Sequence, residues 1–600
     1  MARSFHDDEK EAKNCLRSSN EHDPKDLLTL AKKLMNINSI EYARKVLELA
    51  HASKKFKTAK EAYEIDRRLA VTTYKSLDRP LEEKLEAAQK IIADLLEHTT
   101  DIEQKQELLG IMGSICKQRW QAFGLSQHLH DSLSSYAEGM RLGTKDNGYN
   151  AINAAFVSDL MSFYGGDAKR TLSPEAEAIR KKLLVDLGKK WESLVASIEG
   201  APAGGIPETD LKKIKPNIVE TENDGKEGAA LWVFPTLAEA HLGLGNFEEA
   251  SKYAAAYFVT RPDKWQLETT ARQMGHLAHM ITEVSSNPGT KTAALGVLNH
   301  LLGGNGEAAS SFLRGKVGLA LSGGGFRASL FHIGVLAQLA ELDMLRHVEV
   351  LSCVSGGSII GAYYYLELRK LLTDKTDTKD DADAKDDADA KDDADAKGDA
   401  DVLKQHDYIQ LVQRIETQFL EGVQRNLRLR MLLSSVSNWK VLRSCRSSMT
   451  DRLADLYEEE LYWRINDDKK RKLDELYINP KDADPGFTPK YDNWRRRNKV
   501  PILILNATTL NTCRNWQFTA SYMGEPPSRS LDSEIGGNDR LRRMYHDDAP
   551  PSYRKETNKL RLSQAVAASA CVPGLFQPLV LDGMYGTTYD PERPLEYVTR

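Results

Sequence analysis

The serine at position 355 lies in a context that suits a nucleophile. The run Cys353-Val354-Ser355-Gly356-Gly357-Ser358 follows a short apolar segment and precedes a helical pattern. In a tight strand–serine–helix turn the neighbours must lack bulk, and the strained backbone exposes the hydroxyl. The N–H of Gly356 and the start of the next helix can stabilise negative charge there. The pattern predicts a nucleophile elbow, although Cys353 replaces the first glycine of G-x-S-x-G and a plain strand–turn–helix connection is the alternative.

A run of glycines precedes the serine and lies between another apolar segment and another helical pattern. Its sequence is Ser322-Gly323-Gly324-Gly325-Phe326-Arg327. Consecutive glycines expose backbone N–H groups in a concave loop that suits an oxyanion or a phosphate. Nucleotide binding is disfavoured because no G-K-[ST] follows and no complete G-x-G-x-x-G is present. We expect an oxyanion hole from Gly323, Gly324, Gly325 and Gly356, with support from Phe326 and from Arg327, which could steady the loop, meet a lipid phosphate or be a plain surface residue.

Together, GGGFR and VSGGS resemble the patatin-like phospholipase family, over residues 316–600. Asn506-Ala507-Thr508 resembles the core strand of that family, and 569–578 resembles its S-x-x-x-P-x-x-F-x-P stretch. The resemblance implies a hydrolase that cleaves acyl chains from phospholipids or other lipid esters. It also implies a Ser–Asp dyad with Ser355 as nucleophile, an elbow that includes Cys353, Val354 and Gly357, and neither a metal nor a cofactor.

The aspartate of the dyad is harder to place. The family carries it in a D-G-[GA] motif, and the D-G of this region is Asp582-Gly583-Met584, which departs at the third position. Apolar residues on both sides are typical of a β-hairpin turn. We expect the catalytic aspartate after Arg600, in a truncated domain, with Asp582 as the alternative. A triad that uses His546 and one of the two following aspartates is a further alternative, against which a surface loop is favoured.

The elements around these motifs alternate between strand and helix. Apolar runs at 317–321, 348–351 and 500–505 predict strands, and the patterns at 328–342 and 358–372 predict helices. This alternation indicates a sheet covered on both faces. For 316–600 we expect a three-layer α/β/α patatin-like hydrolase domain.

Residues up to about 300 show paired helical patterns. In the clearest pair, Gly245 separates two helices and Pro262 follows the second; the small and apolar residues that line the pair are Phe234, Leu237, Ala238, Ala250, Ala254 and Tyr257. The spacing resembles tetratricopeptide repeats. With 120–156, it also resembles the helical region beside the TRAF-binding part of some kinase kinase kinases. We expect a polar tail at 1–25 and a TPR-like domain at 26–305 that binds a protein partner or regulates the hydrolase, a scaffold without ligand being the plainer interpretation.

Composition narrows the class of protein. The 600 residues carry a net charge of -5, with 41% hydrophobic and 28% charged residues, which is typical of soluble globular domains and not of a nucleic-acid binder. No secretory signal or membrane-spanning stretch is recognisable, so lipid contact would be peripheral. The six cysteines show no C-x-x-C spacing, which disfavours a zinc site or disulfide framework and favours a cytoplasmic protein.

Two further segments have unusual compositions. The DDADAK repeats within 373–404 lack the glycine and glutamate register of a calcium loop, so we interpret them as a solvated low-complexity linker. The mixed basic and apolar segment 418–431 could lie on a lipid surface, but a helix packed on the domain is favoured. We therefore expect a serine lipid acyl hydrolase with a helical regulatory region; a non-catalytic scaffold with a degenerate hydrolase domain is the alternative.

Overall fold

The computed structural model describes residues 7–17, 22–36, 39–53, 56, 58–76, 81–143, 145–165, 170–190, 232–262, 264–373, 403–425, 448–465, 471–481, 483, 487–510, 513–524, 544–545, 560–572 and 576–581. The chain divides into two compact units, Met1–Gly315 and Lys316–Arg600.

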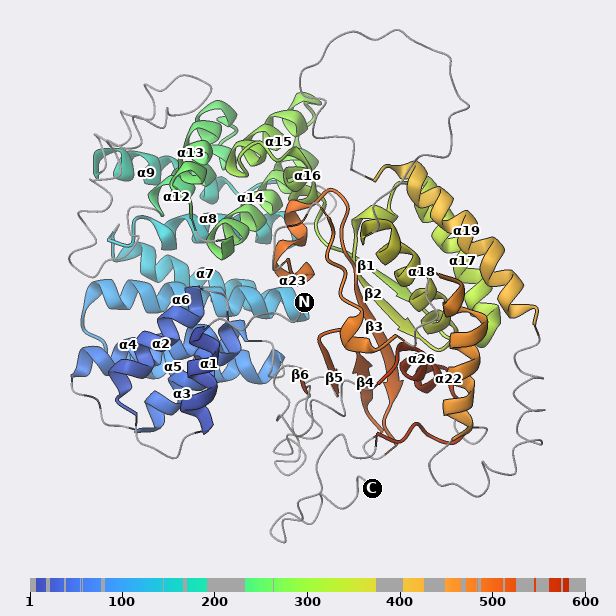
Figure 1. The fold of residues 1–600 in the computed structure, drawn as a ribbon. Helices are drawn as coiled ribbons and strands as arrows, with labels where there is room; N and C mark the ends of the chain where they lie inside the picture. Colours follow the sequence, from blue (N-terminus) through green and yellow to red (C-terminus); the bar gives the residue numbers. More distant parts are fainter. Residues whose placement is uncertain are drawn as a thin grey trace. The chain divides into compact units, whose positions relative to one another are not determined.

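The first unit is helical, and most helices that follow one another in the chain pack side by side (Figure 1). Its described helices are α1 (Asp7–Arg17), α2 (Pro24–Asn36), α3 (Ile40–Ser53), α4 (Ala59–Lys75), α5 (Leu81–His98), α6 (Ile102–Phe123), α7 (Ser126–Arg141), α8 (Tyr149–Gly165), α9 (Pro174–Lys190), α12 (Val233–Gly243), α13 (Phe247–Val259), α14 (Lys264–Val284), α15 (Gly289–Leu301) and α16 (Gly306–Arg314).

The segment expected to be a polar tail, 1–25, contains α1. Ala12 of this helix is fully buried among apolar side chains of α2 and α3. Ser39 donates a hydrogen bond of 2.8 Å to the Glu9 carboxylate, and this contact is buried. The helix therefore belongs to the packed unit.

Small residues set the spacing of several helices, as expected for helical repeats. A methyl group on Gly113 of α6 would lie 2.7 Å from the ring of Tyr136 on α7. The helix pair expected near residue 234 is present as α12 and α13, and Gly245 between them has a φ of +75°. The residues that were expected to line this pair are buried. The helix pair that the sequence predicts, with its glycine turn and its buried lining, is thus present in the structure.

A buried ion pair joins helices of this unit. Arg180 of α9 and Asp159 of α8 are 2.6 Å apart, with side chains that are 1% and 0% exposed. Gly243 of α12 makes room for the guanidinium, since a methyl group there would lie 2.3 Å from its Nε. The attraction between these two charges offsets the cost of removing them from water, so loss of either partner should be destabilising.

Within the described residues, the second unit contains a mixed six-stranded sheet in the order β1-β2-β3-β4-β5-β6. Its strands are β1 (Val317–Leu321), β2 (Val348–Val354), β3 (Ile502–Thr508), β4 (Asn515–Phe518), β5 (Tyr522–Gly524) and β6 (Met544–Tyr545). The pairs β1–β2 and β2–β3 are parallel, and the later pairs are antiparallel. The three strands expected from the sequence are those of the parallel part.

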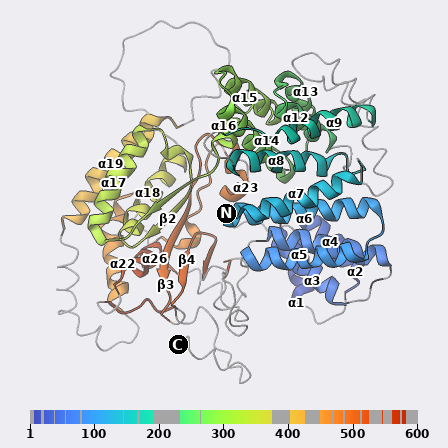
Figure 2. The same cartoon turned by 180° about the vertical axis from the view of Figure 1, so that it is seen from behind.

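The helices of this unit include α17 (Gly325–Glu341), α18 (Gly356–Thr373), α19 (Gln405–Val423), α22 (Met449–Glu460), α23 (Pro489–Asp492) and α26 (Leu562–Ala570), with the short 3-10 turns η2 (Leu345–His347), η3 (Tyr462–Ile465), η4 (Leu473–Glu475) and η5 (Asn493–Arg495). Helix α18 packs across β1, β2 and β3, and α17 packs against α18 and α19, an arrangement that Figure 2 shows from behind.

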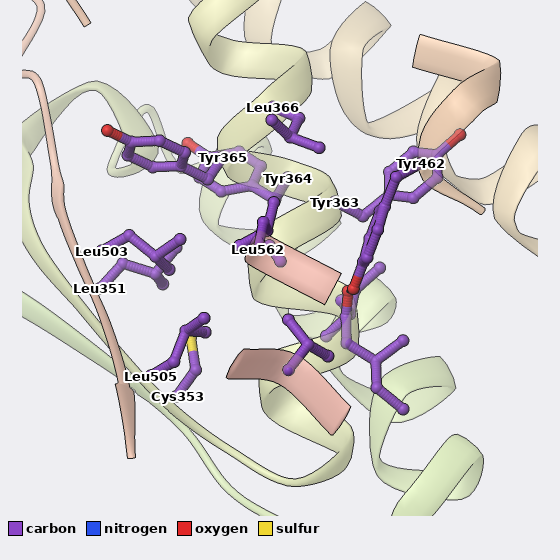
Figure 3. Packing of buried hydrophobic residues seen from close by; sticks show 14 of the residues in the cluster. Leu351, Cys353, Tyr363, Tyr364, Tyr365, Leu366, Tyr462, Leu503, Leu505 and Leu562 are labelled. Atoms are coloured by element: carbon purple, nitrogen blue, oxygen red, sulfur yellow. The ribbon is translucent and has the colours of Figure 1, made fainter. Parts of the chain in front are cut away.

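Alternate residues of the parallel strands supply the core beneath α18. Leu351 and Cys353 of β2 pair in register with Leu503 and Leu505 of β3, and all four are buried. Figure 3 shows these side chains directed toward α18, whose consecutive tyrosines 363–365 are buried as well. The hydroxyl of Tyr365 donates to the carbonyl of Leu476 at 2.7 Å, so its buried polar end is satisfied.

The expected fold class is confirmed: a helical N-terminal unit precedes a unit with a mixed sheet and packed helices. In the part of the chain that the structure describes, no helix is both long enough and apolar enough to cross a membrane.

Candidate active site

Ser355 lies at the junction between β2 and α18. Its φ is +54°, a left-handed value that is rare for a residue with a side chain. Such a conformation costs about 1–3 kcal/mol and persists only where the surroundings enforce it. The residue is half-buried and sits immediately before the first residue of α18. This is the conformation that a nucleophile elbow requires.

The glycine loop expected to form the oxyanion hole lies against this elbow. A methyl group on Gly323 would be 3.0 Å from the Cβ of Ser355 and 3.7 Å from its Oγ. A methyl group on Gly356 would be 2.0 Å from the carbonyl oxygen of Gly325. Gly324 and Gly325 have φ values of +138° and +63°. The two motifs thus meet, and only glycine permits the approach at Gly356.

Hydrogen bonds hold the loop and the elbow together. The Gly357 N–H donates to the Ser322 carbonyl at 3.1 Å. The Ser329 hydroxyl donates to the Gly356 carbonyl at 2.7 Å. His332, which is 4% exposed, has its Nε2 3.0 Å from the Ser322 carbonyl. These contacts fix the position of the glycine loop relative to the elbow. An oxyanion hole built from both segments requires this.

Two helix N-termini converge on this place. Gly325 begins α17 and Gly356 begins α18. The first N–H groups of a helix have no acceptor within the helix, and its dipole favours an anion there. The geometry can therefore receive an oxyanion beside the Ser355 hydroxyl.

Cys353, which stands where the elbow motif has its first glycine, packs against a glycine of α18. Cys353 is 1% exposed, and burial raises the pKa of its thiol, so it stays neutral and unreactive near pH 7. A methyl group on Gly361 of α18 would lie 2.3 Å from the Cys353 Sγ. The elbow motif has glycine at position 353, where this chain has cysteine. The glycine at 361 on the facing helix leaves the space that the cysteine side chain occupies.

The residues flanking the two motifs differ in environment. Phe326 is half-buried and meets the ring of Tyr457 edge to face, with centroids 6.3 Å apart. Arg327 is exposed on the first turn of α17. Val354 is 41% exposed at the end of β2. The loop is thus anchored by Phe326, whereas Arg327 and Val354 face outward.

Sequence reasoning assigned no role to a second serine that touches the elbow. The Ser569 hydroxyl accepts a hydrogen bond of 3.0 Å from the Ser355 N–H. It lies 2.8 Å from the Ser358 hydroxyl and 2.5 Å from the Asn506 carbonyl. The signal available in the sequence was the S-x-x-x-P-x-x-F-x-P stretch that begins with Ser569.

Several sequence expectations fall on residues outside the described part. Asp582 and His546 are among them, as are the DDADAK repeats and residues 426–431. The first part of the 418–431 segment belongs to α19, and Phe419 is fully buried against Tyr363, with ring centroids 5.5 Å apart. Among the described residues, the Ser355 hydroxyl has no hydrogen-bond partner. Within the same ranges, no cluster of three or more metal-ligating side chains is found.

Comparison with known families agrees with the geometry. Residues 319–477 match the family model of patatin-like phospholipases. The chain carries a patatin-like phospholipase domain. The match to this domain includes the glycine loop and Ser355, and it ends before Ser569. Residues 40–158 match a second family model, described as Tetratricopeptide Repeats-Sensor.

Both matches follow the order expected from the sequence. The Tetratricopeptide Repeats-Sensor match spans helices from α3 to part of α8 and ends before the pair α12–α13. No curated protein matches the chain, and neither does any solved structure. The resemblance to the helical region of kinase kinase kinases stays a prediction.

Proposed function

We propose that the patatin-like domain is a serine acyl hydrolase that cleaves lipid esters, with Ser355 as its nucleophile. The observation that carries this proposal is the left-handed Ser355 at the end of β2, set against the Gly323–Gly325 loop. A strained serine beside two helix N-termini fits acyl transfer, because the attack on an ester produces an oxyanion next to the nucleophile.

In this mechanism the Ser355 Oγ attacks the ester carbonyl carbon, and its proton passes to an aspartate base. The oxyanion receives hydrogen bonds from N–H groups among Gly323, Gly324, Gly325 and Gly356. The alcohol leaves with a proton, and water then attacks the acyl-enzyme to release the fatty acid and restore the serine. One candidate for this aspartate is Asp582, which lies outside the described residues.

A phospholipid or another lipid ester is the proposed substrate, and the family match supports this class. The exposed Arg327 and Val354 beside the elbow suit a substrate with an anionic head group and an apolar chain. For the helical unit we propose a protein partner or a regulatory role, which the Tetratricopeptide Repeats-Sensor match supports. A cytoplasmic location remains part of this proposal.

The test is fatty-acid release from phosphatidylcholine vesicles by the full-length protein. Ser355→Ala is expected to reduce kcat by at least about 10³-fold, as loss of a catalytic nucleophile does in serine hydrolases. Ser521→Ala, which removes a half-buried serine between β4 and β5 of the same unit, should leave turnover unchanged. Equal turnover by Ser355→Ala and wild type would exclude Ser355 as the nucleophile, and absence of release by the wild type would favour a non-catalytic scaffold.

A further inference from the structure

We infer that Ser569 is a positioning residue that holds the nucleophile in its strained conformation. This inference deepens the proposed function and rests on it. The Ser569 side chain makes three contacts: with the Ser355 N–H, the Ser358 hydroxyl and the Asn506 carbonyl, at 3.0, 2.8 and 2.5 Å. It therefore links the elbow to the end of β3.

The donors and acceptors of this network can be assigned. A serine hydroxyl has one proton to donate and two lone pairs to accept. The Asn506 carbonyl can only accept and the Ser355 N–H can only donate. Ser569 thus donates to Asn506, accepts from Ser355, and accepts the proton of Ser358 with its remaining lone pair. All of its hydrogen-bonding capacity is used, and each contact has a single consistent direction.

The network has a consequence for the oxyanion hole. Because the Ser355 N–H is directed to Ser569, the nucleophile's own amide is committed to the fold. The oxyanion donors must then come from other amides, which agrees with the positions of the glycine loop 323–325 before α17 and of Gly356 at the start of α18. Ser569 in this way separates the amide that positions the nucleophile from the amides that stabilise charge.

The helix that carries Ser569 is well anchored. Leu562, Val566 and Ala567 of α26 are fully buried. The Gln564 amide donates to Asp451 of α22 at 3.0 Å. A site residue on a packed helix is held more precisely than one on a loop. Ser569 is itself 9% exposed, so water does not readily replace its hydroxyl.

The matched control lies on the same helix. Ser563 is 0% exposed, and its hydroxyl has no hydrogen-bond partner among the residues that the structure describes. Ser563→Ala removes a buried hydroxyl from α26 without breaking a bond to the elbow. Any effect that comes only from losing a buried oxygen on this helix will appear in both Ser563→Ala and Ser569→Ala.

Two readouts on the full-length protein test the inference. In lipid hydrolysis, Ser569→Ala is expected to lower kcat about 10- to 100-fold with little change in KM, because the nucleophile is misplaced by a fraction of an ångström while the lipid site is intact. In hydrogen–deuterium exchange, amides of the segment 353–359 should exchange about tenfold faster, which corresponds to about 1.4 kcal/mol, the upper part of the range for one lost hydrogen bond. Ser563→Ala should match the wild type in both.

Each outcome decides the matter. Wild-type kcat in Ser569→Ala, or an equal loss in Ser563→Ala, overturns the inference. If the wild type shows no turnover, the proposed function fails, and exchange alone then tests the contact: faster exchange in Ser569→Ala supports it and unchanged exchange overturns it. If Ser569→Ala does not fold, Ser569→Cys keeps a side chain that makes only weak hydrogen bonds and should show the same fall in kcat.

Discussion

The Cys353–Gly361 contact predicts a strong coupling between β2, which precedes Ser355, and α18, which follows it. In Gly361→Ala the new methyl would lie 2.3 Å from the Cys353 Sγ and 3.5 Å from its Cβ. The first distance is impossible without a shift, and the second is an ordinary contact. Removing the sulfur by Cys353→Ala therefore removes the clash and leaves space for the methyl group.

The sizes of the effects follow from packing. Gly361→Ala gains about 1 kcal/mol of helix propensity but suffers overpacking of about 1–3 kcal/mol. Cys353→Ala loses the burial of one atom, about 1 kcal/mol. In the double variant the clash disappears while the propensity gain remains, so its stability should approach that of the wild type. The expected coupling free energy is about 1–3 kcal/mol, within the range measured for residues in contact.

The measurement is urea unfolding of the wild type, both single variants and the double variant. Because the chain has two units, the transition of the hydrolase unit is followed through hydrogen exchange of α18 amides, which reports that unit alone. A coupling below about 0.5 kcal/mol, which is the additivity expected of distant sites, would refute the packing argument. It would also remove the structural explanation for a cysteine in the elbow.

Three further perturbations give distinct expectations. Gly356→Ala places a methyl 2.0 Å from a carbonyl of the glycine loop, so phospholipid turnover should fall about 10²-fold, whereas Gly334→Ala on α17, where a methyl meets nothing within 4 Å, should leave it unchanged. Asp159→Asn removes the carboxylate charge that pairs with the buried Arg180 and should lower the free energy of unfolding of the helical unit by about 3–5 kcal/mol, measured by urea titration. Burial, and after it the neighbouring His279 and Lys117, lowers the pKa of His276 from 6.5 to about 4. Because the unfolded chain binds this proton more tightly, stability should be lost as the pH falls from 6.5 to 4. In His276→Gln, thermal melts should show a smaller loss of stability over this pH range.

The strand–Ser355–helix turn and the glycine loop beside it could be predicted because each is a local signal. A strand, a small-residue turn and a helix lie together in the sequence, and the backbone at Ser355 and Gly323 follows from that order. The helix starts were placed a few residues late, at 328 and 358 instead of Gly325 and Gly356. Glycine has a low helix propensity, so a sequence pattern predicts the helix only after the glycines, although both helices begin at a glycine.

The long-range part of the site could not be predicted in the same way. Ser569 is 214 residues from the N–H group that it holds, and no local period reports such a contact. Helix α1 was missed because its sequence is mostly charged. Ala12 is its single fully buried apolar residue, so no apolar period marks the helix. Strand β4 was missed because its 4 residues are too few to establish an alternating pattern, although Gln517 stands between Trp516 and Phe518. In each case tertiary contacts decide what the local pattern leaves open.

The measurement that tests the central claim most directly is covalent labelling of the full-length protein with a fluorophosphonate, followed by mass spectrometry of the labelled peptide. The account predicts modification of Ser355, its loss in Ser355→Ala and its retention in Ser521→Ala. A hydroxyl becomes this reactive only when it is activated by its surroundings. Labelling of another residue, or no labelling of the wild type, would contradict the account of Ser355 as the nucleophile of a lipid hydrolase.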